Sequence, residues 1–198
     1  MVAALLTIME PPEVTELASR AQLRMSFLRI ALFTVPAVVL LGTVSSMLSN
    51  SGYSNAWFRS LDLPDFMPPG WAFPVAWTIL YIMLGLSFAM LLHARGAPRR
   101  GRLIGLFLVQ LAVNLAWSPV FFGMHKVSLG LYLVGAMIAL TVALIVLLWP
   151  VRRAAALLLL PYLAWLGFAA ALNYRVVVDN PNAERLAPRG VSTDIPIS

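Results

Sequence analysis

Two amides and two aromatic rings recur at helical spacing within one apolar stretch of the chain. Gln110, Asn114, Trp117 and Phe121 are four, three and four residues apart, which places them on one face of an α-helix. Amides donate and accept hydrogen bonds, and aromatic rings offer flat apolar surfaces. The pattern contains no nucleophile–base pair and no metal cluster, so it suits the binding of a small molecule, and no catalytic residue is assigned.

Two other apolar stretches carry stripes with the same period. They are Phe73, Trp77 and Tyr81, and Trp165, Ala169 and Asn173. Three such faces can converge on one apolar cavity with a few hydrogen-bonding groups. The alternative is structural, because intramembrane amides often join helices and aromatic stripes often pack a bundle. Asn173 taken alone favours that alternative, whereas the coincidence of three stripes favours a cavity, to which we assign all ten residues.

The segment between residues 57 and 81 is unusually aromatic for a connection. It contains three tryptophans, three phenylalanines, one tyrosine and four prolines. A loop that only joined two helices would be polar and free to vary. We therefore expect this segment to form a lid or a wall of the cavity.

The elements that position these residues are membrane-spanning helices. Hydrophobic residues make up 61% of the 198 residues and charged residues 11%, with a mean hydropathy of +0.86, whereas a soluble domain carries about 25% charged residues. Five apolar runs each approach the ~20 residues that cross a bilayer. They are residues 30–49, 72–92, 103–124, 127–149 and 154–174. The sequence predicts an all-α membrane protein, a five-transmembrane-helix bundle.

The domain boundaries follow from these runs. Residues 1–26 are interrupted by prolines and glutamates and predict an N-terminal extension that is surface-lying or disordered. Residues 27–176 form the membrane domain, and residues 177–198 are expected to be a flexible C-terminal tail.

Arginines predict the orientation of the bundle. Nine basic residues lie on the side of the N-terminus and five on the other, so the positive-inside rule places the N-terminus in the cytoplasm of a bacterial-type cell membrane. The net charge of +6 comes largely from these loops, which points to membrane lipid as a partner and not to nucleic acid. Gly135, Ala139 and Ala143 form a small-residue stripe that predicts either a homodimer contact or packing within the bundle.

The loop and the three stripes together resemble one known family. The string W-F-x-x-L-x-x-P-x-x-x-P-P-x-x-x-F-P-x-x-W-x-x-L-Y begins at Trp57 and is similar to the signature of the TspO/MBR family, the tryptophan-rich sensory proteins and the mitochondrial translocator protein. The match continues from Gln110 through Asn114 to the segment 117–123. It returns at 161–165, Ala169 and 172–174.

This resemblance implies a five-helix bundle with a ligand pocket that opens toward the first loop. The ligand would be a tetrapyrrole, a porphyrin such as protoporphyrin IX or a haem-related compound, and no cofactor would be required. Trp77 and Trp165 correspond to the pair flanking the ligand. The remaining assignments are Gln110 and Asn114 as polar lining, Trp117 as an aromatic wall, Ala169 as a residue that tunes fit, and Phe73 and Tyr81 as pocket-side aromatics.

The sequence also departs from the family pattern. Leu63 and Phe66 stand where a lysine and a tryptophan are common, which makes the loop more apolar. Tyr174 is followed directly by Arg175, so the spacing of the cholesterol-recognition pattern fails. Arg59 is a candidate partner for porphyrin carboxylates near the cavity mouth.

Three functions follow from the resemblance. The first is a membrane receptor or sensor that binds a tetrapyrrole. The second is light- or oxygen-dependent degradation of bound porphyrin, supported by Trp77 and Trp165. The third is a transporter of porphyrin-like or lipid molecules, which the absence of internal repeats and of intramembrane carboxylates or lysines disfavours. Ligand binding is the preferred of these functions because the sequence shows no conventional pair of catalytic residues.

Overall fold

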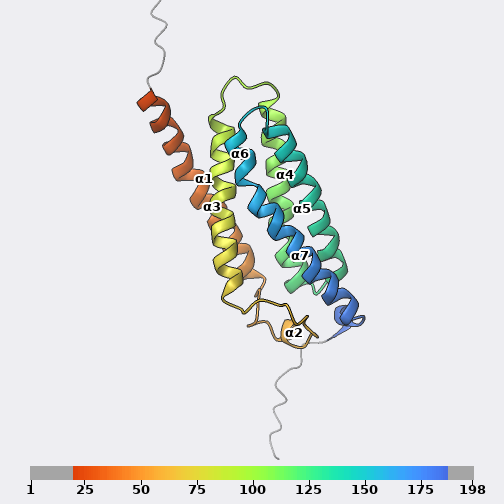
Figure 1. The fold of residues 1–198 in the computed structure, drawn as a ribbon. Helices are drawn as coiled ribbons and strands as arrows, with labels where there is room; N and C mark the ends of the chain where they lie inside the picture. The colour runs from red at the N-terminus through yellow and green to blue at the C-terminus, as the bar shows by residue number, and fades with distance from the viewer. Residues whose placement is uncertain (1–19, 187–198) are drawn as a thin grey trace, which may run out of the picture.

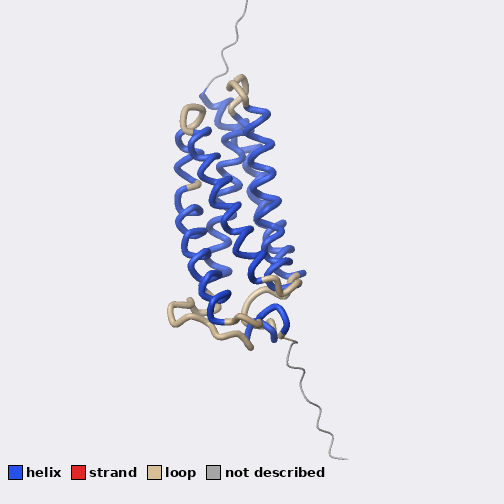
Figure 2. Tube along the Cα trace, turned by 90° about the vertical axis from the view of Figure 1, so that its right-hand side faces the viewer, coloured by secondary structure: helices blue, strands red, loops and turns tan. Residues whose placement is uncertain are grey.

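A computed structural model describes residues 20–186 of the protein (Figure 1; Figure 2). These residues form an all-α bundle of five membrane-crossing segments. Consecutive membrane-crossing segments run in opposite directions (Figure 1), and no strand occurs among the described residues. The helices are α1 (Arg20–Leu48), α2 (Ala56–Arg59), α3 (Ala72–His93), α4 (Arg100–Ser118), α5 (Val127–Leu148), α6 (Arg153–Leu158) and α7 (Leu160–Asp179), with a π-helical turn η1 (Pro119–Gly123) and a 3₁₀ turn η2 (Ala183–Arg185). The predicted fold class is confirmed: the chain is an integral, multi-pass membrane protein.

The N-terminal and C-terminal segments of the chain differ from the predicted domain boundaries. α1 begins at Arg20, so residues 20–26 continue the first helix and do not belong to a separate extension, because no proline or glycine interrupts them. The rest of the extension, residues 1–19, lies outside the described residues. Assigning residues 177–186 to a flexible tail is wrong, since α7 continues to Asp179 and η2 follows. Residues 187–198 also lie outside the described part.

Two prolines shape the helices that line the interior. Pro119 ends the regular part of α4, and the N–H of Met124 donates to the carbonyl of Pro119 at 2.8 Å, five residues back. Pro161 lacks an N–H group, so the last span divides into α6 and α7 around Leu159. These local changes of pitch rotate the residues that follow, which is a common use of π turns and proline breaks.

The helix α1 packs mainly against α3, while α3 to α7 enclose the core. Gly85 allows the contact, because an added Cβ atom would lie 2.7 Å from the Cα of Val35. The hydroxyl of Thr34 donates to the carbonyl of Gly85 at 3.1 Å. The outer face of α1 is apolar and exposed, at Leu32, Phe33 and Leu40 for example, as lipid contact requires. Its N-terminal half leans away from the bundle (Figure 1).

The small-residue stripe of α5 lies on the outside of the bundle. Gly135 and Ala139 are exposed, and Ala143 is half-buried. No neighbour would contact a Cβ atom added at Gly135. The stripe therefore does not serve packing within one chain, and the homodimer contact stays a prediction.

Candidate ligand-binding site

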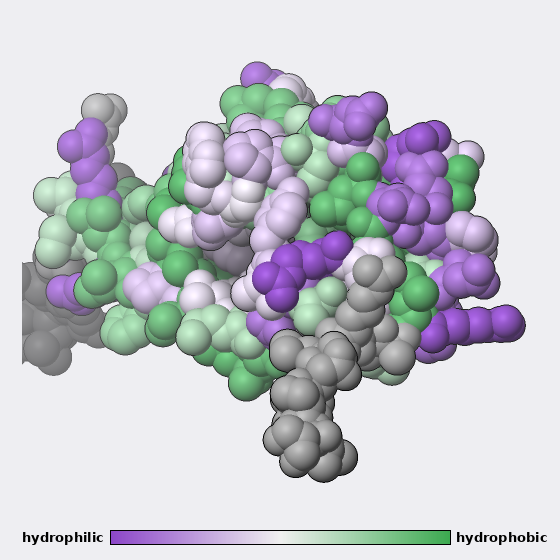
Figure 3. All heavy atoms as spheres, turned by 90° about the horizontal axis from the view of Figure 1, so that it is seen from below, coloured by the Kyte–Doolittle hydropathy of each residue, from purple (hydrophilic) through white to green (hydrophobic). Residues whose placement is uncertain are grey.

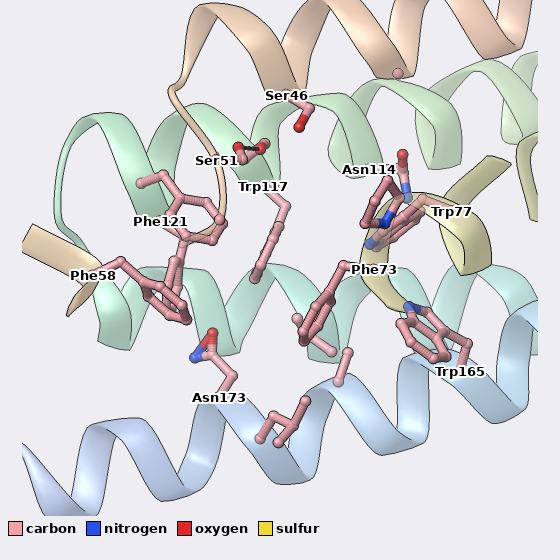
Figure 4. A pocket seen from close by; sticks show the side chains of 18 of the residues that line it. Ser46, Ser51, Phe58, Phe73, Trp77, Asn114, Trp117, Phe121, Trp165 and Asn173 are labelled. Carbon is pink, nitrogen blue, oxygen red and sulfur yellow. Dashed lines mark hydrogen bonds between the residues drawn. The ribbon is translucent and has the colours of Figure 1, made fainter. Parts of the chain in front are cut away.

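A cavity of about 560 Å³ lies inside the bundle, next to the end that carries α2. Its walls come from the C-terminal half of α1, the start of α3, the end of α4 with η1, the first half of α5, and α7. Nine of the ten residues predicted from the sequence line it: Phe73, Trp77, Tyr81, Asn114, Trp117, Phe121, Trp165, Ala169 and Asn173. Figure 4 shows several of them pointing toward one another from different helices. The structure brings them together; their contact with a ligand stays a prediction.

Aromatic rings form two groups around this space. At the deeper end, the ring of Trp165 stands edge-on to the rings of Trp77 and Phe73, with centroid separations of 6.5 and 6.1 Å. Nearer to η1, the rings of Trp117 and Phe121 stack at 5.0 Å. Edge-on and stacked arrangements are the favourable geometries for such rings. The cavity therefore presents flat apolar faces that differ in orientation.

A hydrogen-bonded cluster closes the deep end. The amide nitrogens of Asn114 and Gln110 donate to the hydroxyl of Tyr162 at 2.8 and 2.7 Å. The hydroxyl of Tyr81 donates to Oδ1 of Asn114 at 3.1 Å. Gln110 is fully buried and does not line the cavity, because it lies one turn deeper than Asn114 on α4. It supports the site through Tyr162.

Tyr162 was absent from the predicted site, although a signal for it existed. It lies three residues before Trp165, so it extends the stripe on α7 by one turn. We expect Tyr162→Phe to leave the amide nitrogen of Gln110 without an acceptor in an apolar interior, and that of Asn114 with only the sulfur of Met137 at 3.6 Å. The loss should destabilise the fold by about 1–3 kcal/mol. Thermal unfolding in detergent measures this cost. Tyr132→Phe, which changes an exposed tyrosine on α5, is the control, and equal unfolding temperatures for the two variants would contradict the role of the cluster.

Asn173 has the structural contact expected of it and also faces the cavity. Its Nδ2 donates to the carbonyl of Val127 at 3.0 Å, which joins α7 to the start of α5. Its Oδ1 and the indole nitrogen of Trp117 are buried without a partner among the described residues. Both atoms lie close to Gly130, within 3.2 and 3.5 Å of the position of an added Cβ. The residue therefore joins helices and lines the site at once.

The end of the cavity is covered by the loop 49–71, as the aromatic composition of that loop predicts. Trp57, Phe58 and Leu61 are buried in a second apolar cluster with Phe121 and Phe122. Asn55 caps α2 by accepting from the N–H of Phe58, and its own amide donates to the carbonyl of Phe122. This covering is a packed layer with an apolar interior. Seen from this end, hydrophilic side chains are interspersed with apolar ones on its outer surface (Figure 3).

The C-terminal turn, residues 180–186, fastens the loop 49–71 and was missed by the sequence analysis. The indole nitrogen of Trp57 donates to the carbonyl of Ala183 at 2.9 Å. The side chain of Asn180 pairs with both backbone groups of Asp62, at 2.8 and 2.9 Å. These contacts join residues more than 100 positions apart, so no local sequence pattern predicts them.

Charged groups near this end lie outside the cavity. Glu184 accepts from the backbone N–H of Ser128 and pairs with Lys126 at 3.3 Å. The hydrogen bond from Ser128 is the main cause that lowers the pKa of Glu184, and Lys126 lowers this pKa further. The contact is thus complete at neutral pH and weakens only as the pH falls through the lowered pKa. The ring of His125 stacks on Trp57 at 4.4 Å, and burial lowers the pKa of this histidine. Arg59 is exposed and is not part of the lining.

No acidic or basic side chain from residues 20–186 lines the cavity. Its polar groups are hydroxyls, two amides and indole nitrogens. Such a lining accommodates an apolar, flat molecule and offers it a small number of hydrogen bonds. A charged group of a ligand would have to stay outside, because an isolated charge is costly in an apolar interior.

Comparisons with known proteins agree with the sequence motifs. A model of the TspO/MBR family matches residues 33–178. The chain is 37% identical over 130 residues to protein CrtK of Rhodobacter capsulatus, covering 64% of this chain and 79% of that protein. It is 38% identical over 157 residues to the translocator protein of Bos taurus, covering 74% and 90% of the two chains. It is 34% identical over 149 residues to the tryptophan-rich protein TspO of Archaeoglobus fulgidus, covering 74% and 94%. The family resemblance is therefore confirmed, and the chain belongs to the TspO/MBR family.

Proposed function

We propose that this protein is a membrane receptor or sensor that binds a tetrapyrrole, a porphyrin such as protoporphyrin IX, in the cavity beneath the loop 49–71. The observation that carries the proposal is the aromatic arrangement of Phe73, Trp77 and Trp165 around an uncharged space. A porphyrin is a large flat aromatic ring, and aromatic side chains are the surfaces on which such rings stack. The volume of about 560 Å³ lies within the range of about 300–1,000 Å³ that small-molecule sites occupy.

The uncharged lining also orients the ligand. Protoporphyrin carries two carboxylates on one edge of the ring, and burying them without a cation would cost several kcal/mol or more. The macrocycle therefore enters with its apolar edge first, toward Asn114 at the deep end. The carboxylates stay on the side of the cavity where the lining residues Thr43 and Thr78 are exposed and carry hydroxyl groups.

The membrane setting belongs to the same proposal. The loops 94–99 and 149–152 lie at the end of the bundle where α1 begins (Figure 1). Nine of the 14 lysine and arginine residues lie in these loops, within three residues of them, or in the segment 20–29. The positive-inside rule then puts that end in the cytoplasm of a bacterial cell and the cavity near the opposite surface. The exposed small residues of α5 supply a face for a homodimer.

Degradation of bound porphyrin is the second candidate. Trp77 and Trp165 are perpendicular, with an interplanar angle of 82° and centroids 6.5 Å apart, and both line the cavity. Two indoles beside an excited porphyrin are oxidisable groups in contact with the ligand. No conventional catalytic pair supports this activity, so binding is the first candidate.

One titration separates the two functions. Protoporphyrin IX is added to the purified protein in the dark, and the saturated sample is then illuminated in air. We expect saturable binding in the dark at one porphyrin per chain. If degradation occurs, Trp165→Phe is expected to retain binding and to lose bleaching by about 10-fold or more, since phenylalanine keeps the aromatic face but is much harder to oxidise. Equal bleaching in wild type and variant would eliminate degradation by this indole.

A further inference from the structure

The exposed residues of the cavity lining all lie in one region. Among the described residues that line it, those exposed at the molecular surface are Thr43, Met47, Tyr53, Gly70, Pro74 and Thr78. They belong to the last turns of α1, the first turns of α3 and the loop between these helices. The lining residues from α4, α5 and α7 are buried or half-buried. The cavity therefore reaches the surface at the side of the bundle, between α1 and α3.

Close contacts bound this opening at both ends. Toward the middle of the membrane, α1 and α3 meet at Gly42, where an added Cβ atom would lie 2.1 Å from the ring of Tyr81. Toward the loop, the ring of Tyr53 lies against Gly70, 3.0 Å from the position of an added Cβ. The hydroxyl of Tyr53 also donates to the carbonyl of Pro68 at 3.0 Å. These two contacts thus mark the two ends of the opening between α1 and α3.

The other routes into the cavity are closed by packed residues. The end is covered by Trp57 and Phe58, which are 0% and 5% exposed, and the C-terminal turn holds this cover through Ala183 and Asn180. On the opposite side of α3, an apolar groove lies between α3 and α7. Trp165 lines both this groove and the cavity, so its indole forms the wall between them.

The surroundings of the opening are apolar at the depth of the membrane. Leu40, Val44 and Val75 are exposed beside it on the membrane-crossing helices. Thr43 and Thr78 place hydroxyl groups at its rim. At about 1.5 Å per residue, Thr43 lies roughly 8 Å from the end of α1 at Leu48. A bilayer has a hydrocarbon core about 30 Å thick, with a layer of headgroups on each side. The depth of Thr43 therefore corresponds to the boundary between the headgroups and the acyl chains.

We propose that this opening, bounded by Thr43 and Met47 of α1 and Pro74 and Thr78 of α3, is a lateral portal through which the ligand passes directly from the lipid. The molecule that fits this route is a flat amphiphile that dissolves in the bilayer with its polar edge at headgroup level. The inference rests on the proposed binding function and adds the source and route of the ligand. The loop 49–71 is then a fixed cover, and the ligand does not enter through it.

Stopped-flow mixing tests the route. Wild-type protein in phosphatidylcholine nanodiscs is mixed in the dark with phosphatidylcholine vesicles that contain protoporphyrin IX, and porphyrin transfer is followed by its absorbance. Met47→Phe with Thr78→Phe narrows the portal, and we expect both association and dissociation to slow about 10-fold or more, because passage is obstructed in both directions. Val44→Phe with Val75→Phe is the matched control, since these exposed residues lie on the same helices and outside the lining. Rates for the narrowed portal equal to those of the control would overturn the proposal.

A loosened cover distinguishes the competing route. Asn180→Ala removes both bonds to Asp62, and the portal predicts an unchanged association rate in this variant. Faster association would show that the ligand passes the loop and would also overturn the proposal.

A second readout does not depend on porphyrin. The chain contains no cysteine, so Thr78→Cys provides one site for a nitroxide spin label. A portal open to lipid predicts that dissolved oxygen relaxes the label more strongly than a water-soluble nickel chelate, and the opposite order would contradict it. If wild type shows no saturable protoporphyrin binding, the proposed function fails, and this measurement still decides whether the opening faces lipid.

Discussion

Replacing Trp77 and Asn114 together by alanine is expected to weaken protoporphyrin IX binding by about 30-fold or more. Loss of an aromatic stacking partner costs about 1–3 kcal/mol in flat-ring recognition, and each 1.4 kcal/mol is about a tenfold change in Kd. Trp77 supplies one of the two indoles at the deep end. Asn114 supplies the amide that connects the cavity to Tyr81 and Tyr162. The two losses act on one ligand contact region, so they need not be additive.

The measurement is a dark titration followed by the absorbance of the porphyrin, because removing a tryptophan also changes protein fluorescence. Trp149→Ala with Asn182→Ala is the matched control: both residues are exposed, and neither lines the cavity. Circular dichroism checks that each variant remains helical. An unaltered titration in the Trp77/Asn114 variant would reject the proposed pocket.

Gly85→Ala is expected to produce the largest loss of stability from a single methyl group. The added carbon would lie 2.7 Å from the Cα and 3.2 Å from the backbone nitrogen of Val35, and backbone atoms cannot rotate away as a side chain can. The two helices must separate, which also strains the bond from Thr34 to the carbonyl of Gly85. Overpacking of this kind costs about 1–3 kcal/mol, equivalent to a decrease of roughly 3–10 °C in Tm.

Gly105→Ala is the control for this substitution. It lies within α4, exposed, with no neighbour in reach of an added Cβ, so alanine should be neutral or stabilising by up to about 1 kcal/mol. Thermal unfolding of both variants in the same detergent provides the comparison. Because α1 forms one side of the portal, Gly85→Ala should also weaken porphyrin retention. A Tm equal to that of Gly105→Ala would mean that α1 is not held at this crossing.

Helical periodicity explains why most of the site was predictable. The stripe from Gln110 to Phe121 is set by the pitch of one helix, so the shared direction of Asn114 and Trp117 followed from their spacing alone. Depth along the helix did not follow. Gln110 shares the face but lies beyond the deep end of the cavity, where the hydroxyl of Tyr162 accepts from its amide nitrogen. How far a cavity extends depends on side chains from other helices.

The features that the sequence did not disclose arise from long-range contacts. Asn180 and Ala183 stand in a polar, proline-containing segment that resembles a tail. They become ordered because Asp62 and Trp57 supply hydrogen-bond partners from the other end of the chain. The lateral opening is similar, since it depends on where Gly42 and Tyr81 bring α1 and α3 together. The early start of α1 at Arg20 was predictable in principle, because the residues before the apolar run contain no helix breaker.

A structure of the protein with bound protoporphyrin IX, determined in a lipidic environment, tests the central claim most directly. The account predicts density for one macrocycle per chain inside the cavity, between the rings of Trp77 and Trp165. Its carboxylate edge should point toward the opening between Met47 and Thr78. An empty cavity with porphyrin held elsewhere, in the outer groove between α3 and α7 for instance, would contradict it.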